Sequence, residues 1–475
     1  MSAPAADIAG FPDAAALLAA LRDGHTSVVS VVEALLERHG RNRNLGAFCA
    51  VDEAAVRRAA AEADAKLAQG VRMPLLGLPL CIKDNIDVLG LPTTAGTPAL
   101  EGFYPARTAP VAQRLLDQGA LVFGKTAMHE LAFGTSGNNA WQGAAHNPFD
   151  LNRIPGGSSS GTAAAIAAGL VPAGLGSDTG GSVRIPAAFC GLVGLRPTIG
   201  RYPGEGVFPI SFTRDTVGPL ARNFTDLALL DAAIAGADTT LEAIEPSTVR
   251  LGVPDAFFFD GLQQDVAKAS EQALAALSRA GVSLVPVSGA RFGELYRRAG
   301  VTVTLHETRP AITAYLRASG LSISYDDVVA KVASPDVRSI LADLDARAEA
   351  PFLAAYRQAV DIDRPALQAL YAETVIGARL DGIVFPTTKL AALRIGQDVV
   401  DLGEGQVPAF DLMIENSGPG SLSGMPGITV PCGVDSAGVP LGLSVDGLFH
   451  TDRRLLAIGA MLEWLLPNPL RRGER

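Results

Sequence analysis

Two glycine-rich serine turns, separated by a segment without charge, constrain the fold of this chain more than any other feature. The first turn is Gly156-Gly157-Ser158-Ser159-Ser160-Gly161, and the second is Thr179-Gly180-Gly181-Ser182. The span 154–177 carries no charged residue and is rich in alanine and glycine. A membrane helix does not fit this span, because it contains Pro155, Pro172 and ten glycines and serines. The sequence therefore predicts a tightly packed core segment.

The second turn can supply both a nucleophile and hydrogen-bond donors. A serine hydroxyl needs a base to take its proton, and acyl transfer needs donors aimed at the oxygen that becomes negative. Glycine lets the backbone turn sharply and approach a ligand closely. The N–H groups of Thr179, Gly180, Gly181 and Ser182 can therefore converge on an oxyanion beside the Ser182 hydroxyl.

Lys83 is the candidate base for this serine. None of the six histidines lies in the glycine-rich turns. Lysine can accept a proton if burial and neighbouring groups lower its pKa from about 10.4 to roughly 7–8. Lys83 follows the apolar run Leu80-Cys81-Ile82, which suits a desolvated position.

Each of these motifs has a plainer interpretation when it is taken alone. Glycine and serine runs are often flexible linkers, and a lysine is almost always on the surface. A phosphate-binding loop would need the pattern G-x-x-x-x-G-K-[ST], and no lysine follows Gly161. The joint occurrence of Lys83 and the two turns, with 24 positions from Ser158 to Ser182, favours a catalytic site.

The order of the motifs and this serine spacing resemble the amidase signature family, nearest to its bacterial indoleacetamide and mandelamide hydrolases. One departure is Ser160, where the family more often has glycine, and it affects only local loop geometry. Segments that also match the family lie at 124–126, 128–134, 147–148, 189–198, 209–219, 424–431 and 438–443.

The resemblance implies a role for each residue of the turns. Ser182 would be the nucleophile, and Ser158, after a cis peptide bond from Gly157, would pass its proton to Lys83. The oxyanion hole would be formed by the backbone N–H groups of Thr179, Gly180, Gly181 and Ser182. Supporting positions, which could equally be a structural ion pair or cap, are Ser159, Asp178 and Arg184. Residues of the matching segment that could border the pocket are Ala132, Phe133 and Gly134. No cofactor and no metal is implied.

Alternating strand and helix patterns predict an α/β fold, and the resemblance implies a central mixed β-sheet flanked by helices on both faces. It also implies one domain over 1–475, with an N-terminal helical segment at 1–70 and a signature core at 74–236. The helix-rich region 288–380 matches the family least, and we expect it to line the substrate pocket. Expected helices are 13–22, 28–39, 54–69, 111–118, 162–168, 262–279 and 365–379, and expected strands are 78–83, 120–123, 250–253, 283–287 and 382–385.

The composition indicates which kinds of binding partner and which cell compartment to expect. A net charge of −10 gives no basic footprint for nucleic acid. The four cysteines, far apart and in apolar contexts, are expected to be buried reduced thiols. The first twenty residues hold two aspartates and no lysine or arginine, so we do not expect a signal peptide. A membrane is not expected as a partner. We expect a cytoplasmic enzyme with a small-molecule amide substrate, and a homodimer is one possible assembly.

These patterns together predict an amidase that hydrolyses the C–N bond of a small aryl or arylacetamide-type amide through an acyl-Ser182 intermediate. A carbamate, anilide or ester hydrolase could use the same residues. A different class, the A-type subunit of a glutamine-dependent amidotransferase, carries glutamine after the motif arginine, whereas this chain has Ile185. A catalytically inactive binding module is disfavoured, because Lys83, Ser158 and Ser182 are all present.

Overall fold

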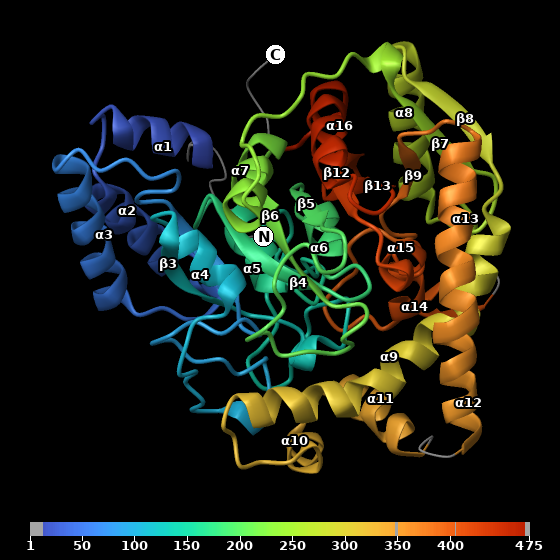
Figure 1. Ribbon diagram of the computed structural model, residues 1–475, viewed down its shortest axis with the longest axis horizontal. Coiled ribbons are helices and arrows are strands. Elements are labelled where there is room, and N and C mark those ends of the chain that lie inside the picture. The colour runs from blue at the N-terminus through green and yellow to red at the C-terminus, as the bar shows by residue number, and fades with distance from the viewer. Residues whose placement is uncertain (1–12, 347–349, 404, 471–475) are drawn as a thin grey trace.

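A computed structural model describes residues 13–346, 350–403 and 405–470. Within these residues an eleven-stranded sheet runs through the molecule in the order β1-β3-β2-β4-β6-β5-β12-β13-β9-β7-β8 (Figure 1). Its strands are β1 (Phe48–Ala50), β2 (Pro79–Lys83), β3 (Leu121–Thr126), β4 (Ala173–Asp178), β5 (Val193–Arg196), β6 (Thr216–Ala221), β7 (Arg250–Pro254), β8 (Ser283–Val287), β9 (Gly382–Pro386), β12 (Gly427–Val434) and β13 (Pro440–Asp446). A separate hairpin joins β10 (Val399–Asp401) to β11 (Gln406–Pro408).

Helices cover the sheet and extend beyond it (Figure 1). The α-helices are α1 (Ala14–Arg22), α2 (Val28–Arg41), α3 (Glu53–Ala68), α4 (Pro110–Asp117), α5 (Ser160–Ala167), α6 (Arg184–Phe189), α7 (Phe224–Ala235), α8 (Gln264–Arg279), α9 (Ala290–Ala318), α10 (Tyr325–Lys331), α11 (Pro335–Ala346), α12 (Ala350–Gln358), α13 (Arg364–Gly377), α14 (Ala409–Ile414), α15 (Gly418–Ser423) and α16 (Asp452–Leu465). A 3-10 turn at Glu130–Ala132 and a π turn at Ala359–Asp363 bear on the argument below.

The α/β fold with a mixed sheet and flanking helices is confirmed, and each helix and strand expected from the sequence occurs within a few residues of its predicted bounds. The described part of segment 1–70 contains α1, α2 and α3 and the short strand β1, which pairs antiparallel with β3. Region 288–380 contains α9 to α13 and is helix-rich, as expected.

The strand pairing brings distant parts of the sequence into one sheet. Strand β2 lies between β3 and β4 and is parallel to both. Strand β5 pairs antiparallel with β6 on one side and with β12 on the other. The signature region and the C-terminal strands are therefore joined by backbone hydrogen bonds.

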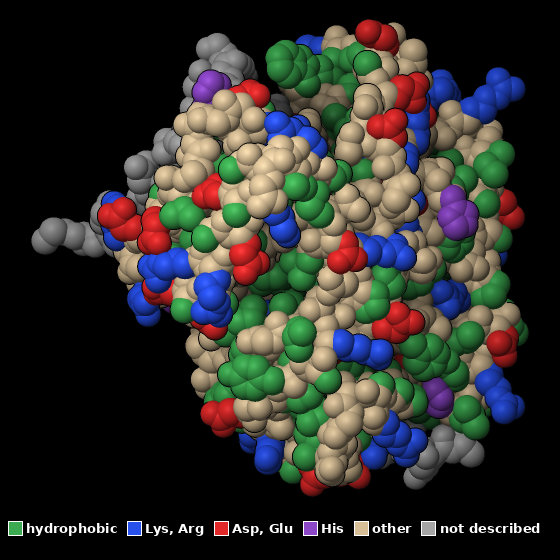
Figure 2. Space-filling model, turned by 60° about the vertical axis from the view of Figure 1, so that its left-hand side comes forward, with side chains coloured by type: hydrophobic (Ala, Val, Ile, Leu, Met, Phe, Trp, Pro, Cys, Tyr) green, Lys and Arg blue, Asp and Glu red, His purple; other side chains and the backbone are tan. Residues whose placement is uncertain are grey.

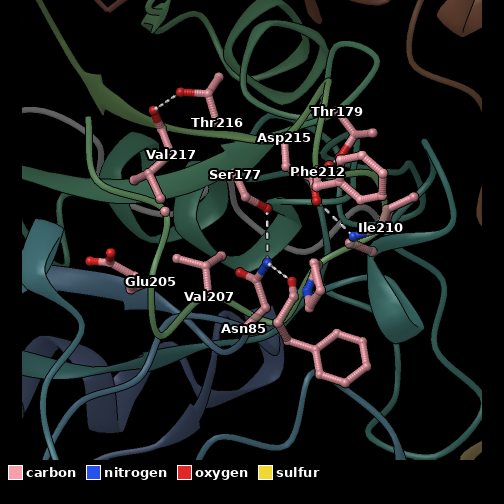
Figure 3. Close-up of a pocket in the computed structure, with 14 residues that line it drawn as sticks. Asn85, Ser177, Thr179, Glu205, Val207, Ile210, Phe212, Asp215, Thr216 and Val217 are labelled. Atoms are coloured by element: carbon pink, nitrogen blue, oxygen red, sulfur yellow. Dashed lines mark hydrogen bonds between the residues drawn. The ribbon is translucent and has the colours of Figure 1, made fainter. Parts of the chain in front are cut away.

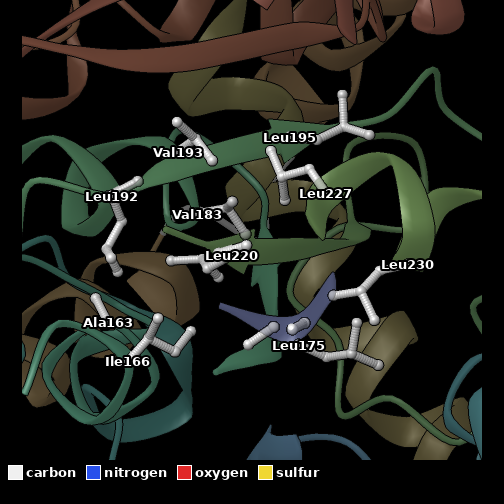
Figure 4. Packing of buried hydrophobic residues seen from close by; sticks show 14 of the residues in the cluster. Ala163, Ile166, Leu175, Val183, Leu192, Val193, Leu195, Leu220, Leu227 and Leu230 are labelled. Atoms are coloured by element: carbon white, nitrogen blue, oxygen red, sulfur yellow. The ribbon is translucent and has the colours of Figure 1, made fainter. Parts of the chain in front are cut away.

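The uncharged segment is the packed core that the sequence predicts. Every residue from 154 to 178 is buried, and α5 contacts strands β2, β3, β4 and β6. A Cβ atom at Gly161 would lie 2.2 Å from the Ala47 carbonyl oxygen, so only glycine lets α5 approach this closely. Figure 4 shows Ala163 and Ile166 of α5 in the same cluster as Leu220 of β6 and Leu227 of α7.

The surface is mixed in character. On the face shown in Figure 2, acidic, basic and hydrophobic side chains are interspersed and no continuous basic patch is seen. Among the described residues, no helix combines the length and the apolar character needed to cross a membrane.

Candidate active site

Lys83 lies at the end of β2 and is fully buried. Its Nζ atom is 2.7 Å from Ser158 Oγ and 2.8 Å from Ser177 Oγ. In the described chain, no carboxylate oxygen lies within 4.0 Å of this nitrogen, so Lys83 forms no ion pair. Burial lowers the pKa of Lys83 to about 7, although the charges of Asp178 and Asp215 act to raise it. The amine can therefore be neutral near neutral pH.

The first serine turn directs Ser158 toward this lysine. The peptide bond between Gly157 and Ser158 is cis, as the resemblance implies. The backbone N–H of Ser159 donates to the carbonyl oxygen of Ser182 over 3.3 Å, so the two serine turns lie against each other. Ser182 is 8% exposed, and its hydroxyl makes no hydrogen bond with the described residues, which leaves it available to a ligand.

A buried ion cluster holds the second turn. The Asp178 carboxylate, at the end of β4, accepts hydrogen bonds from Arg184 Nη2 and Arg196 Nη1, each at 3.1 Å. Burial alone would raise the pKa of Asp178, but the charges of the two arginines lower it below its ordinary value. Arg184 also donates to Ser421 Oγ at 2.7 Å and lies 3.5 Å from Asp446, which ties the turn to the C-terminal part of the chain.

The backbone donors of the turn differ in one respect from the expectation. Gly181, at φ +129°, has its N–H bonded to Asp178 Oδ1 at 2.8 Å. The N–H groups of Thr179, Gly180 and Ser182 make no hydrogen bond within the described chain. Three of the four predicted oxyanion donors are therefore unengaged.

Thr179 is held by two residues that the sequence did not single out as site residues. Its hydroxyl donates to Asp215 Oδ1 at 2.6 Å, and its carbonyl oxygen accepts from Arg214 Nε at 3.2 Å. Burial raises the pKa of the Asp215 carboxyl above its ordinary value. Asp215 belongs to segment 209–219, which matches the family, and this match is the sequence feature that could have identified it as a site residue.

A cavity of about 370 Å³ opens beside these residues (Figure 3). Its walls are largely apolar and include Ala132, Val207, Phe208, Ile210, Phe212 and Val217. Its polar lining includes Asn85, Ser177, Thr179, Asp215 and Thr216, with Glu205 the one further charged side chain. No lysine or arginine of the described chain lines it, so the cavity suits a neutral, largely apolar group.

Asn85 lines this cavity and carries an unpaired acceptor atom. Its Nδ2 atom donates to Ser177 Oγ at 3.0 Å and to the Phe208 carbonyl oxygen at 3.2 Å (Figure 3). Its Oδ1 atom is buried and has no hydrogen-bond partner in the described residues. Asn85 and Ser177 were missed from the sequence, although Asn85 follows Lys83 by two positions and Ser177 precedes Asp178.

The other predicted pocket residues are placed differently. Ala132 lines the cavity, whereas Phe133 and Gly134 do not. Gly134 packs against the ring of His129, which would lie 2.1 Å from a Cβ atom there. That ring contacts Asp336 Oδ2 at 3.0 Å. Ser159 supports the site by accepting from the N–H of Ser177 at 3.3 Å.

The cysteines do not take part in this site. Cys81, Cys190 and Cys432 are buried free thiols, as expected, and burial raises their pKa values. Cys49 is exposed, contrary to the expectation, because the short strand β1 lies at the sheet edge. Within the described ranges, no group of three or more histidine, cysteine, aspartate or glutamate side chains could hold a metal ion.

Comparisons with known proteins match nearly the whole chain. The family model described as Amidase matches residues 30–456. The mandelamide hydrolase of Pseudomonas putida is 43% identical, covering 93% of this chain and 90% of its own. The indoleacetamide hydrolase of Agrobacterium vitis is 41% identical, covering 93% and 94%. The solved peptide amidase of Stenotrophomonas maltophilia matches with a TM-score of 0.84 and 30% identity, over 98% of this chain and 99% of that one.

Proposed function

The chain belongs to the amidase family and hydrolyses amide C–N bonds, and from that premise we propose that it cleaves a small aryl or arylacetamide-type amide through an acyl intermediate on Ser182. The observation that carries this proposal is the contact of a fully buried Lys83 with Ser158, at 2.7 Å. A lysine with a pKa of about 7 can take a proton from a serine network at neutral pH.

The reaction proceeds in two halves. Ser182 Oγ attacks the amide carbonyl carbon while its proton moves to Ser158 and the Ser158 proton moves to Lys83 Nζ. The proton then returns through Ser158 to the leaving nitrogen, and the C–N bond breaks to leave an acyl ester on Ser182. Water attacks this ester after losing a proton to the same pair, and the Ser182 hydroxyl is restored as the carboxylic acid leaves.

The oxyanion of each tetrahedral intermediate is stabilised by the unengaged N–H groups of Thr179, Gly180 and Ser182. Gly181 contributes by fixing the turn through its bond to Asp178. Asp178, Arg184 and Ser159 act on this turn as supporting residues.

The substrate class follows from the cavity walls and from the relatives. A neutral aromatic acyl group fits between Phe208, Ile210 and Phe212. The Asn85 Oδ1 atom, buried without a partner, can accept a hydrogen bond from an N–H or O–H group of the substrate. The printed names of two relatives, mandelamide hydrolase and indoleacetamide hydrolase, support an aromatic amide.

Region 288–380 stays a predicted contributor to specificity. The cavity beside Lys83 is lined mainly by residues 204–217 and, in the described chain, by none from 288–380. Helix α9 contacts the loop that carries this lining, because Glu307 accepts hydrogen bonds from Ser211 Oγ at 2.5 Å and from the Thr213 N–H at 3.1 Å. The region would therefore shape the cavity through the loop that it supports.

Ser182→Ala tests the nucleophile. We expect kcat to fall at least about a thousandfold, because no other hydroxyl is placed to carry the acyl group. A serine-directed phosphonyl fluoride should label Ser182 in the wild-type protein, as read by peptide mass spectrometry. Ser160→Ala is the matched control, because its hydroxyl donates to the Ala127 carbonyl oxygen and should change kcat little. Label on Ser158 would reverse the two serine roles, and a folded Ser182→Ala variant with normal turnover would refute the assignment.

A substrate panel separates the alternatives that share this chemistry. Primary aryl amides, anilides, carbamates, esters and glutamine should be compared by kcat/KM. We expect the highest value for a primary aryl amide. Preferred turnover of glutamine would instead support an amidotransferase-type subunit, which Ile185 after Arg184 disfavours.

The cytoplasmic location and the homodimer belong to the same proposal. The four free cysteines support the first, because disulfides are rare in reducing compartments, and the second stays a prediction. Cell fractionation and sedimentation analysis of the purified protein would test them separately.

A further inference from the structure

The carbonyl groups of the second serine turn are held from behind. Four successive carbonyl oxygens, from Asp178 to Gly181, each accept a hydrogen bond. The donors are Arg196 Nη1 to Asp178, Arg214 Nε to Thr179 at 3.2 Å, Ser417 Oγ to Gly180 at 2.5 Å and Ile185 N to Gly181 at 2.7 Å.

These contacts bear directly on the oxyanion donors. Each carbonyl shares a planar peptide unit with the N–H of the following residue. The Thr179 carbonyl, bonded to Arg214, therefore fixes the direction of the Gly180 N–H. A donor on the carbonyl side also polarises the unit and strengthens the hydrogen bond that its N–H can make.

Arg214 differs from Arg184 and Arg196 because it has no carboxylate partner in the described chain. Arg184 and Arg196 both pair with the Asp178 carboxylate. The buried side chain of Arg214 donates instead to neutral oxygens, the Gly300 carbonyl at 2.8 Å and Thr304 Oγ1 at 2.6 Å, both on α9. Among the described residues it forms no ion pair within 4.0 Å.

We propose that Arg214 is a positioning residue for the oxyanion hole, which holds the Thr179–Gly180 peptide unit through the Thr179 carbonyl oxygen and places beside it a positive charge that forms no ion pair of its own in the described chain. This inference rests on the proposed role of Ser182 and the turn before it. A buried charge without a carboxylate partner favours the negative oxygen of the tetrahedral intermediate over the neutral carbonyl of the substrate. Arg214 would therefore act on kcat more than on KM, and it would link α9 to the reaction.

Arg214→Met and Arg214→Gln both remove the charge, and either soluble variant tests the proposal. We expect kcat to fall roughly tenfold to a hundredfold, less than or equal to the loss typical of a direct oxyanion donor. KM for a primary aryl amide should stay within about twofold. Affinity for phenylboronic acid, which forms an anionic tetrahedral adduct with a nucleophilic serine, should fall in parallel with kcat.

Arg364→Met is the matched control. Arg364 is half-buried and donates to the Thr213 carbonyl oxygen at 3.0 Å, one residue before Arg214, without reaching the turn. We expect this variant to keep kcat and boronate affinity within about threefold of wild type. Arg214→Lys, which keeps the charge, should recover part of both.

Three results would overturn the inference. The first is an unchanged kcat and boronate affinity in a folded Arg214→Met or Arg214→Gln variant. The second is an equal loss in Arg364→Met, which would assign the effect to the loop as a whole. The third, measured on the wild-type protein, is a crystal structure of the boronate adduct whose oxygen does not face the Gly180 N–H. Phosphonyl labelling at Ser182 separates a failure here from a failure of the proposed function, because it tests the nucleophile alone.

Discussion

Lys83 and Lys125 are both fully buried on neighbouring strands, but their side chains have different partners. Lys125 lies 3.5 Å from the Asp84 carboxylate and donates to the Pro92 carbonyl oxygen at 2.8 Å. Lys83 contacts two hydroxyl groups. Burial lowers the pKa of both amines, but the Asp84 charge favours a protonated Lys125. Lys125 also donates to a hydroxyl, Thr93 Oγ1 at 3.0 Å, so the difference is that Lys83 has no carboxylate within 4.0 Å in the described chain.

The pH dependence of turnover should report Lys83. A base must be neutral to accept a proton, so we expect kcat/KM for an aryl amide to rise as the pH rises through about 7 and then to reach a plateau. The apparent value belongs to the coupled Lys83, Ser158 and Ser182 group rather than to one residue. Initial rates from pH 5 to pH 10 would measure it.

A Lys83→Ala variant provides the control for that profile. It should lose most activity on the amide and less on the matched ester, whose leaving alkoxide depends less on receiving a proton. A wild-type pH profile in this variant would remove the lysine from the mechanism. Equal losses on the two substrates would argue against proton delivery to the leaving group.

At the residue scale, the sequence was sufficient where chemistry is local. The two turns and Lys83 were identified from motifs of a few positions, whereas the cis peptide bond was implied by the family resemblance. Asn85 and Arg214 were not identified as site residues, because their partners are Phe208 and helix α9, about a hundred positions away in the chain. Such contacts depend on tertiary packing, which short-range patterns do not encode.

At the element scale, the segment after β3 connects the active site to the helical region. The His129 N–H donates to the Ser158 carbonyl oxygen at 3.2 Å. The next residue, Glu130, is fully buried and accepts hydrogen bonds from the N–H groups of Ala333, at 3.0 Å, and Ser334, at 2.6 Å. These two donors stand at the start of α11, so one short segment supports both Ser158 and a helix N-terminus.

Glu130→Ala should therefore destabilise the protein. Removing the carboxylate leaves the buried Ser334 N–H and the partly buried Ala333 N–H without an acceptor, and we expect the free energy of unfolding to fall by about 2–4 kcal/mol. Urea unfolding followed by circular dichroism would measure the change. Glu294→Ala is the control, because that side chain is 64% exposed in its pair with Arg298 and should matter by less than about 0.5 kcal/mol. Equal stability of wild type and Glu130→Ala would refute the capping role.

Elements with a clear period were predictable, and those interrupted by glycine and proline were not. The helices and strands named from the sequence all occur. The long strands β12 and β13 were noted only as matching motifs, because glycine and proline are depleted in strands. Their pairing with each other and with β5 and β9 outweighs that preference.

At the scale of the whole molecule, the signature region depends on the C-terminal third of the chain. Strand β5 needs β12 as a neighbour, and the buried Arg184 needs Ser421 and Asp446. Figure 1 shows strands from the two parts side by side in one sheet. This interleaving supports the prediction that the chain forms a single domain without an internal boundary at 236.

A fragment of residues 1–236 should not fold. Its edge strand β5 would lose the β12 ladder, and Arg184 would lose two of its buried partners. We expect such a fragment to aggregate or to lack protected amides in hydrogen exchange, whereas the full chain should unfold in one main transition. A soluble fragment with native-like exchange protection would contradict the one-domain prediction.

The burial of Lys83 has a further consequence, for the response of folding to protons. The unfolded lysine keeps its ordinary pKa of 10.5, whereas the folded one has a pKa of about 7. Between these values the unfolded chain binds one proton more, so the free energy of unfolding should rise by about 1.4 kcal/mol per pH unit from this group. The penalty is complete below pH 7 and disappears above pH 10.5. Lys83→Met, inactive but free of this penalty, should be more stable than wild type by a few kcal/mol at pH 7, and that advantage should shrink by pH 9.5. If the urea midpoints of Lys83→Met and wild type differed by the same amount at the two pH values, Lys83 would titrate normally in the folded protein. Its burial would then contribute nothing to the pH dependence of the free energy of unfolding.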